Sequence, residues 1–142
     1  MEITQLHTLT AGQIRDLTAL MEELDPEITV TPEMLRAAVE DPGTRFFAVM
    51  GADGRIVGTA TLCISHSPTG RKGGIEDVVV SSACRGQGLG RRLMEHVVAY
   101  ARTELSPIVL HLTSRPSRVA ANALYRALGF LPYDTNVYKL PL

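Results

Sequence analysis

The sequence predicts an α/β domain in which helices cover both faces of a central mixed β-sheet. Apolar residues recur at helical spacing in some segments, and alternate or run together over strand-like lengths in others. Strands and helices alternate only in the second half of the chain, which favours a mixed sheet over a fully parallel one. No repeat, linker or low-complexity tract interrupts the 142 residues, so we expect a single domain over residues 1–142.

Cap and turn residues delimit the elements of the first half. Thr10 is expected to cap a helix that Asp25-Pro26 ends. Thr31-Pro32 has the pattern of a second helix start, a cap followed by proline at the first helical position. Asp53-Gly54 predicts a hairpin turn. The expected elements are an edge strand at 3–9, helices at 10–24 and 31–40, and strands at 45–50 and 55–64.

The second half alternates between strands and helices. Residues 67–74 are polar and rich in glycine, and we expect a loop there. Gly129 stands where a left-handed residue closes the last helix. The buried face of the first of these helices should comprise Leu89, Leu93, Met94, Val97 and Ala101. The expected elements are strands at 74–80, 107–112 and 136–140, and helices at 88–103 and 117–128.

Composition excludes several classes of function. The net charge of -1, from 14 basic and 15 acidic residues, gives no general attraction to nucleic acid or to anionic membranes. Cys63 and Cys84 are too few for a disulfide framework and have no metal-ligand spacing. The chain shows no secretory signal and no membrane-spanning apolar run. We therefore expect a cytoplasmic protein with no metal, no nucleic-acid partner and no membrane association.

A glycine-rich segment carries the sharpest chemical signal. Arg85-Gly86-Gln87-Gly88-Leu89-Gly90, followed by Arg91, lies between a predicted strand and a predicted helix. The glycines let the backbone approach a ligand closely, and the helix start presents unpaired N–H groups and the positive end of its dipole. Arg85 and Arg91 add positive charge. The segment therefore predicts a binding site for a pyrophosphate.

Two common pyrophosphate motifs do not match this segment. A P-loop requires GxxxxGK[ST], which the sequence lacks. A dinucleotide fingerprint requires a third glycine where Arg91 stands, and an acidic residue about twenty positions later that is also missing.

Two segments resemble the signatures of one family. Val78-Val79-Val80 followed by Arg85-x-x-Gly88-x-Gly90 resembles the acetyl-CoA signature of the GNAT superfamily of N-acetyltransferases. Residues 121–130 resemble its second signature, Ala-x-x-Leu-Tyr-x-x-x-Gly-Phe, in the expected order and spacing. The resemblance covers roughly residues 45–138. It implies a GNAT-like acyl-CoA N-acyltransferase fold and transfer of an acetyl group from acetyl-CoA to a primary amine of a small molecule or peptide, by direct attack in a ternary complex.

The resemblance also implies roles for particular residues. The pantetheine arm would pair with the backbone near Val78 and Val80, and Tyr125 would be the general acid that protonates the thiolate. Arg118 stands where many members carry an asparagine, and Asn122 lies on a different helical phase, so their contacts with the coenzyme stay open. The implied cofactor-binding residues are Val78, Val79, Val80, Arg85, Gly86, Gln87, Gly88, Leu89, Gly90, Arg91, Arg118 and Asn122.

A general base is harder to assign. Strand periodicity puts Glu76 on one face with Val78 and Val80, and Asp77 on the other. Glu76, acting through a water, is our candidate, with Asp77 or no side-chain base as alternatives. His111 fits a packed histidine better than a catalytic one. An acidic cluster near residues 22–27 either attracts a cationic amine or forms a solvated face: Glu22, Glu23, Asp25 and Glu27.

The acceptor stays open at this level. Residues 74–80 look like those of the glucosamine-phosphate branch of the superfamily, but variants of this run are widespread. An amino sugar, amino acid, polyamine, antibiotic or protein N-terminus all fit. A non-catalytic acyl-CoA-binding or regulatory module and a protein N-acetyltransferase are the alternatives. The sequence specifies no oligomeric state, and a homodimer is compatible with the resemblance.

Overall fold

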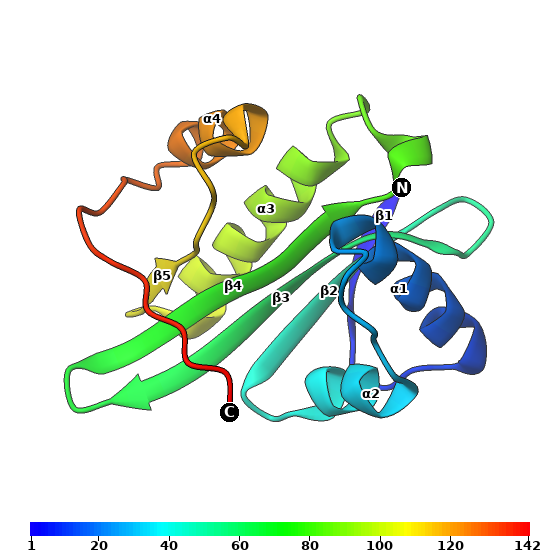
Figure 1. Cartoon of the computed structure of the whole chain (residues 1–142), viewed down its shortest axis with the longest axis horizontal. Helices are drawn as coiled ribbons and strands as arrows, with labels where there is room; N and C mark the ends of the chain where they lie inside the picture. The colour runs from blue at the N-terminus through cyan, green and yellow to red at the C-terminus, as the bar shows by residue number, and fades with distance from the viewer. The chain divides into compact units, whose positions relative to one another are not determined.

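The computed structural model describes all 142 residues, which form two compact units, Met1–Leu112 and Thr113–Leu142. The first unit contains a sheet with helices, and the second contains one helix and an extended segment (Figure 1). None of the helices is long and apolar enough to cross a membrane. The elements of the first unit are β1 (Glu2–Leu6), α1 (Ala11–Leu24), α2 (Pro32–Glu40), β2 (Thr44–Met50), β3 (Ile56–Ser67), β4 (Gly70–Val80), a 3₁₀ turn (Ser82–Cys84), α3 (Leu89–Tyr100), a π-helical turn (Ala101–Leu105) and β5 (Val109–His111).

The sheet is mixed, as predicted. Its five strands lie in the order β1-β2-β3-β4-β5, with β1 at one edge. The first three pairings are antiparallel, and β4 pairs with β5 in parallel. A parallel pair needs a long crossover, and α3 supplies it between β4 and β5.

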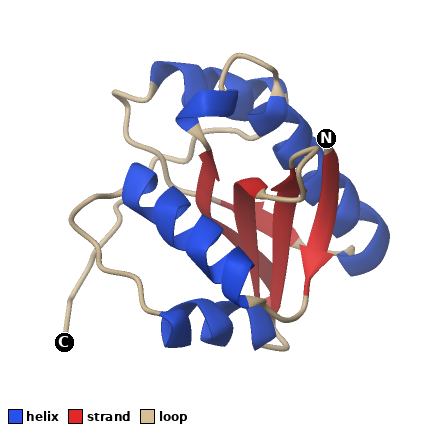
Figure 2. Cartoon of the chain, turned by 90° about the vertical axis from the view of Figure 1, so that its right-hand side faces the viewer, coloured by secondary structure: helices blue, strands red, loops and turns tan.

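Helices cover both faces of this sheet, which confirms the predicted fold class (Figure 2). Alternation along β2 directs Phe46 and Ala48 into a core with α1 and α2. Phe47, on the opposite face, packs edge-on against His96 and Tyr100 of α3, with ring centroids 5.2 and 5.3 Å apart. The inner face predicted for this helix is buried throughout α3 and into the π-helical turn: Leu89, Leu93, Met94, Val97 and Ala101.

Side-chain caps start α1 and α2 at the predicted residues. Thr10 Oγ1 accepts from the amide of Gln13 at 3.2 Å, and Gln13 Oε1 accepts from the amide of Thr10 at 2.9 Å. This reciprocal capping box satisfies two backbone donors at the helix start. Thr31 accepts from the amide of Met34 at 3.2 Å, and Pro32 occupies the first helical position.

The second unit is built around α4 (Val119–Ala127). Gly129 follows it with φ 99°, the left-handed conformation expected at this position. The amide of Phe130 donates to the carbonyl of Tyr125 at 3.0 Å and closes the helix end. The ring of Phe130 packs edge-on against that of Tyr125, with centroids 6.2 Å apart.

Several sequence expectations are wrong in detail. Residues 67–74 form no loop, because β3 and β4 pair as a hairpin from Ser67 and Gly70 onward. Gly73 lies under Leu110 and Leu62, whose atoms would approach an added Cβ to 2.8 and 2.9 Å, so close strand packing explains this glycine. The helix expected at 88–103 becomes π-helical from residue 101, and the strand expected at 107–112 is three residues long.

The strand expected at 136–140 is absent. An extended segment becomes a strand only where its backbone pairs with a neighbouring strand. Alternation of apolar and polar residues shows that a segment suits such pairing, but it does not specify the neighbour.

Candidate functional site

A β-bulge interrupts β4 just where the site residues begin. Glu76 pairs with Thr61 and Val79 pairs with Thr59, so Asp77 and Val78 stand together opposite a single residue of β3. Asp77 has φ 52°, a left-handed conformation that is uncommon for residues other than glycine but accessible to aspartate. The bulge therefore shifts the phase of the strand between Glu76 and Val79.

This bulge corrects the expected facing of the strand. Glu76 and Val79 share a face, because their partners Thr61 and Thr59 are two residues apart on β3. Val79 is 6% exposed and belongs to the core under α1 and α2, whereas Val78 and Val80 are half-buried. The expectation that Glu76 shares a face with Val78 and Val80 is therefore wrong. Strand periodicity alone gives no signal of an inserted residue.

The outer edge of β4 is open over the same residues. β4 pairs with β5 only at three positions, Lys72, Gly73 and Gly74. From residue 75 to residue 80, β4 has a strand neighbour on the β3 side alone. An open edge presents backbone N–H and C=O groups to which an extended ligand can pair.

The glycine segment follows this open edge and leads into α3. Gly86 and Gly88 have φ 80° and 72°, and a Cβ added to either would meet no atom within 4 Å. The first helical hydrogen bond runs from the amide of Arg92 to the carbonyl of Gly88 at 3.1 Å. The amides of Leu89, Gly90 and Arg91 therefore precede the helical ladder and are available to a ligand. Open space, free amides and a positive helix end together fit a diphosphate.

The two arginines of this segment differ in their surroundings. Arg85 Nε donates to the carbonyl of Val80 at 3.3 Å, which bends the side chain back to the end of β4. Arg91 Nε lies 2.8 Å from Glu95 Oε1 in an exposed i,i+4 ion pair on α3. Glu95 therefore offsets part of the charge that Arg91 brings to the helix start.

Acidic side chains gather beside Cys63 on the face that carries Glu76. Cys63 pairs with Gly74, two residues before Glu76 on β4. Burial raises the pKa of the Cys63 thiol, and the negative charges of Glu76, Asp77 and Asp41 raise it further. Three carboxylates therefore act on the Cys63 thiol at this end of the sheet face.

His111 lies on the same part of the sheet. It is the last β5 residue that pairs with β4, opposite Gly74. An added Cβ at Gly74 would meet His111 Cε1 at 3.0 Å, so the imidazole packs over this glycine. His111 itself is exposed, so it contacts the sheet without being enclosed by it.

The second unit holds the remaining predicted site residues on α4. Tyr125 packs against Phe130 as described above. Asn122 Nδ2 donates to the carbonyls of Arg115 and Arg118, at 2.9 and 2.8 Å, and so holds the turn that begins the helix. Arg118 is the residue at the start of α4, and its side chain is exposed.

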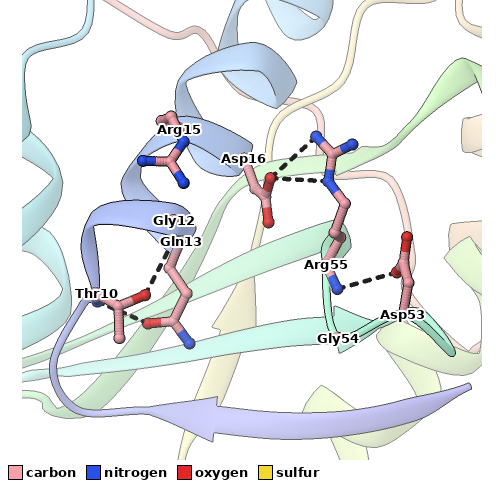
Figure 3. Close-up of a pocket in the computed structure, with 8 residues that line it drawn as sticks. All are labelled: Thr10, Gly12, Gln13, Arg15, Asp16, Asp53, Gly54 and Arg55. Atoms are coloured by element: carbon pink, nitrogen blue, oxygen red, sulfur yellow. Dashed lines mark hydrogen bonds and ion pairs between the residues drawn. The ribbon is translucent and has the colours of Figure 1, made fainter.

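Two surface hollows lie in the first unit. One, of about 440 Å³, lies between the start of α1 and the β2–β3 turn (Figure 3). There Asp16 holds Arg55 at 3.2 Å and accepts from the amide of Ile56 at 3.1 Å. The other, of about 350 Å³, is lined by Thr18, Glu22, Pro26, Ile28, Thr29 and Val30, from α1 and the connection to α2.

In the first unit, the three valines end β4 just before the glycine segment, and a Cβ added to Gly90 would meet Val80 Cγ2 at 3.9 Å. Glu76 lies further back on the same strand, where β4 also lacks an outer neighbour. Two features escaped sequence reasoning. One is the bulge at Asp77 and Val78. The other is a pair of hydrogen bonds from Ser82, just before the glycine segment, to Glu23 of α1.

Curated relatives match part of the chain. A streptothricin acetyltransferase of Streptomyces lavendulae is 38% identical over 93 residues, which are 64% of this chain and 47% of the relative. Glucosamine 6-phosphate N-acetyltransferase 1 of Oryza sativa subsp. japonica is 32% identical over 102 residues, covering 62% of this chain and 59% of the relative. The chain spans about half the length of the curated relatives it matches.

The fold and a family profile match over more of the chain. A solved structure from Agrobacterium tumefaciens str. C58 is 25% identical and superposes with a TM-score of 0.83, covering 99% of this chain and 100% of the other. The profile of the acetyltransferase (GNAT) family matches residues 12–130, which include both predicted signatures. The chain therefore belongs to the acetyltransferase (GNAT) family.

Proposed function

We propose that this protein is an N-acetyltransferase that transfers an acetyl group from acetyl-CoA to a primary amine by direct attack in a ternary complex. The observation that carries the proposal is the open edge of β4, which leads directly into the amide-rich start of α3. An extended arm ending in a diphosphate needs both features in this order. The family match over residues 12–130 supports the same activity and favours one domain over the whole chain.

The glycine segment would hold the diphosphate of the coenzyme. The amides of Leu89, Gly90 and Arg91 supply donors, and Gly86 and Gly88 leave room for the phosphates. Arg85 and Arg91 supply charge, while Gln87 lies between the two glycines. Val78, Val79 and Val80 would contribute backbone groups to the pantetheine arm, because this part of β4 lacks an outer strand.

Glu76 is our candidate for the group that accepts the proton of the amine. An ammonium group has no lone pair, so it must lose a proton before it attacks. Glu76 is exposed at the open part of β4, and its charge, with those of Asp77 and Asp41, raises the pKa of the Cys63 thiol on the same face. A carboxylate there attracts a cationic amine and can take its proton, directly or through a water.

Tyr125 is our candidate for the general acid. Acetyl-CoA supplies the acetyl group as a thioester, whose sulfur leaves as a thiolate. A phenol is a proton donor at neutral pH and can protonate that sulfur. Tyr125 stands at the tyrosine of the second signature, on α4. Arg118 and Asn122 remain candidates for coenzyme contacts, although the amide nitrogen of Asn122 already holds two carbonyls.

A small-molecule amine is the acceptor class that we favour. The two curated relatives are named for streptothricin and for glucosamine 6-phosphate, both of which are small molecules. The hollow of about 350 Å³ under the α1–α2 connection, with Glu22 in its lining, is large enough for part of such a ligand. Both cysteines are free thiols, in agreement with a reducing, cytoplasmic location.

A screen of amines for acetyl-CoA-dependent thiol release tests the activity. The library should include amino sugars, amino acids, polyamines, aminoglycosides and short peptides. We expect turnover with at least one small-molecule amine. Coenzyme binding without turnover on any amine would instead indicate the non-catalytic module, and turnover on peptides alone would indicate a protein N-acetyltransferase.

Tyr125→Phe tests the assigned acid once an acceptor is found. We expect kcat to fall by about 10²-fold or more while the KM for acetyl-CoA changes little, because the phenol would act on the leaving group. Tyr133→Phe, on an exposed tyrosine of the same unit, is the matched control and should keep kcat. A rise in KM with kcat preserved would make Tyr125 a packing residue.

A further inference from the structure

Glu23 is joined to the segment that precedes the glycines. Its carboxylate accepts from the amide of Ser82 at 3.0 Å and from Ser82 Oγ at 3.1 Å. Glu23 lies in the last turn of α1, 59 positions before Ser82 in the chain. The contact therefore joins the helix beside the second hollow to the start of the coenzyme segment.

Ser82 is the point from which the glycine segment departs. It begins the 3₁₀ turn Ser82–Cys84, and Arg85 follows immediately. The amide of Ser81 donates to the carbonyl of Val57 at 2.8 Å, which fixes the preceding residue to β3. With Glu23 on the other side, the segment is anchored to a strand and to a helix just before its glycines.

We propose that Glu23 is a positioning residue for coenzyme binding: its carboxylate, through Ser82, holds the segment 85–91 in its diphosphate-binding geometry. The inference rests on the proposed function. Glycines leave many backbone conformations open, so the segment depends on its flanks for a defined shape. A carboxylate that accepts hydrogen bonds from both the amide and the hydroxyl of Ser82 holds it more strongly than a neutral side chain would.

The negative charge of Glu23 distinguishes a positioning role from a purely electrostatic role and from a role in binding the acceptor. Glu23 is an anion near a site for an anion, so a purely electrostatic effect would weaken coenzyme binding, and its removal would tighten it. A role in attracting a cationic acceptor would raise the KM of the amine when Glu23 is removed and leave coenzyme affinity the same or tighter. Positioning alone predicts weaker coenzyme binding after removal of a negative charge.

The test compares two substitutions that remove the same charge. Glu23→Ala removes both hydrogen bonds, whereas Glu23→Gln keeps the reach and one oxygen that can accept from the Ser82 amide. Both residues favour helices, so α1 should form in each variant. Glu33→Ala, on an exposed glutamate of α2, is the control for loss of one negative charge.

Calorimetric titration with CoA, which needs no acceptor, provides the readout. We expect Glu23→Ala to bind CoA about tenfold more weakly than the wild type, Glu23→Gln to lie between them, and Glu33→Ala to match the wild type. Ser82→Ala should weaken binding, and should add little in a Glu23→Ala background, since both act through one contact. In turnover, the KM for acetyl-CoA should rise with kcat nearly unchanged.

The CoA titrations separate the positioning role of Glu23 from the proposed function. Equal or tighter CoA binding by Glu23→Ala, or full additivity with Ser82→Ala, would overturn the positioning role and leave the proposed function intact. A wild-type protein that fails to bind CoA would overturn the proposed function and this inference together. Thermal unfolding of every variant shows whether a loss of binding reflects a loss of fold.

Discussion

The two edges of β4 behave in opposite ways. On the β3 side, pairing extends from Gly70 to Val80 and is interrupted only by the bulge. On the β5 side, pairing ends after Lys72–Gly74. The β3 side thus fixes β4 in the sheet, while on the β5 side the backbone groups of residues 75–80 are not paired with any strand. The same strand can therefore support the core and receive a ligand.

The position of the open edge matters more than its length. Exposed strand edges invite unwanted pairing, and proteins usually shield them. Here the open part adjoins the start of α3 and lies next to the bulge that turns Glu76 and Val79 to one face. An open edge in that place is what the proposed binding of the pantetheine arm requires, together with the glycine segment that follows it.

The largest effect should come from filling the glycine segment. Gly88→Glu adds bulk and a negative charge at the start of α3, where φ is 72°. We expect CoA binding to fall below detection by calorimetry, a loss of at least about 100-fold, because the side chain competes with the diphosphate for the same amides.

Gly54→Glu is the matched control for Gly88→Glu. Gly54 has φ 79° and open space around it, but lies in the β2–β3 turn. The Gly54→Glu substitution imposes a comparable backbone strain and adds the same charge, but in a turn outside the glycine segment and α3. Retained CoA binding in this variant shows that strain is not the cause of the loss. Unchanged affinity in Gly88→Glu would contradict our placement of the diphosphate.

A smaller effect is expected from the two acids that flank the start of the bulge. Glu76→Gln should lower kcat by about 10²-fold, because the amide cannot accept the proton of the amine. Asp77→Asn should keep most of kcat, since asparagine also tolerates the left-handed conformation that Asp77 adopts. Steady-state kinetics with the acceptor from the amine screen measures both.

The reverse ranking would identify Asp77 as the base. Equal, small losses in the two variants would indicate a reaction without a side-chain base. Circular dichroism and thermal unfolding of both variants check that the fold survives each change.

Much of the fold follows from the sequence, because the signals involved are local. Thr10 and Thr31 cap the helices that their patterns predict, and Gly129 closes α4 in the predicted conformation. The inner face of α3 is also as expected. Each of these features depends on residues within a few positions of one another, which periodicity and capping rules describe well.

The errors arise where the structure depends on distant residues. The bulge at Asp77 is decided by how β4 registers against β3, and no pattern within β4 encodes it. The hydrogen bonds of Glu23 join positions 59 apart in the chain. The acidic cluster at residues 22–27 therefore does not reveal from the sequence that one of its members binds Ser82. Gly73 and Gly74 suggested a loop, whereas Leu110 and His111 pack over them in the sheet.

The smallest effect concerns the ionisation of Cys63. Burial and the charge of Glu76 raise the pKa of this thiol, so the folded state favours the neutral form. The resulting stabilisation is complete below the ordinary thiol pKa and is lost as pH rises through the raised value of the folded protein. We expect unfolding free energy to fall more steeply in alkaline solution for the wild type than for Cys63→Ser, measured by urea unfolding.

The same thiol can report on Glu76 directly. In a Cys84→Ser background, the pH dependence of alkylation by iodoacetamide should have its midpoint above that of the chain in denaturant, because the thiolate is the reactive form. Glu76→Gln should lower this midpoint without restoring the ordinary value, since burial is the larger cause. A midpoint insensitive to Glu76→Gln would mean that Glu76 does not act on the face that carries Cys63, and the facing inferred from the bulge would then be wrong.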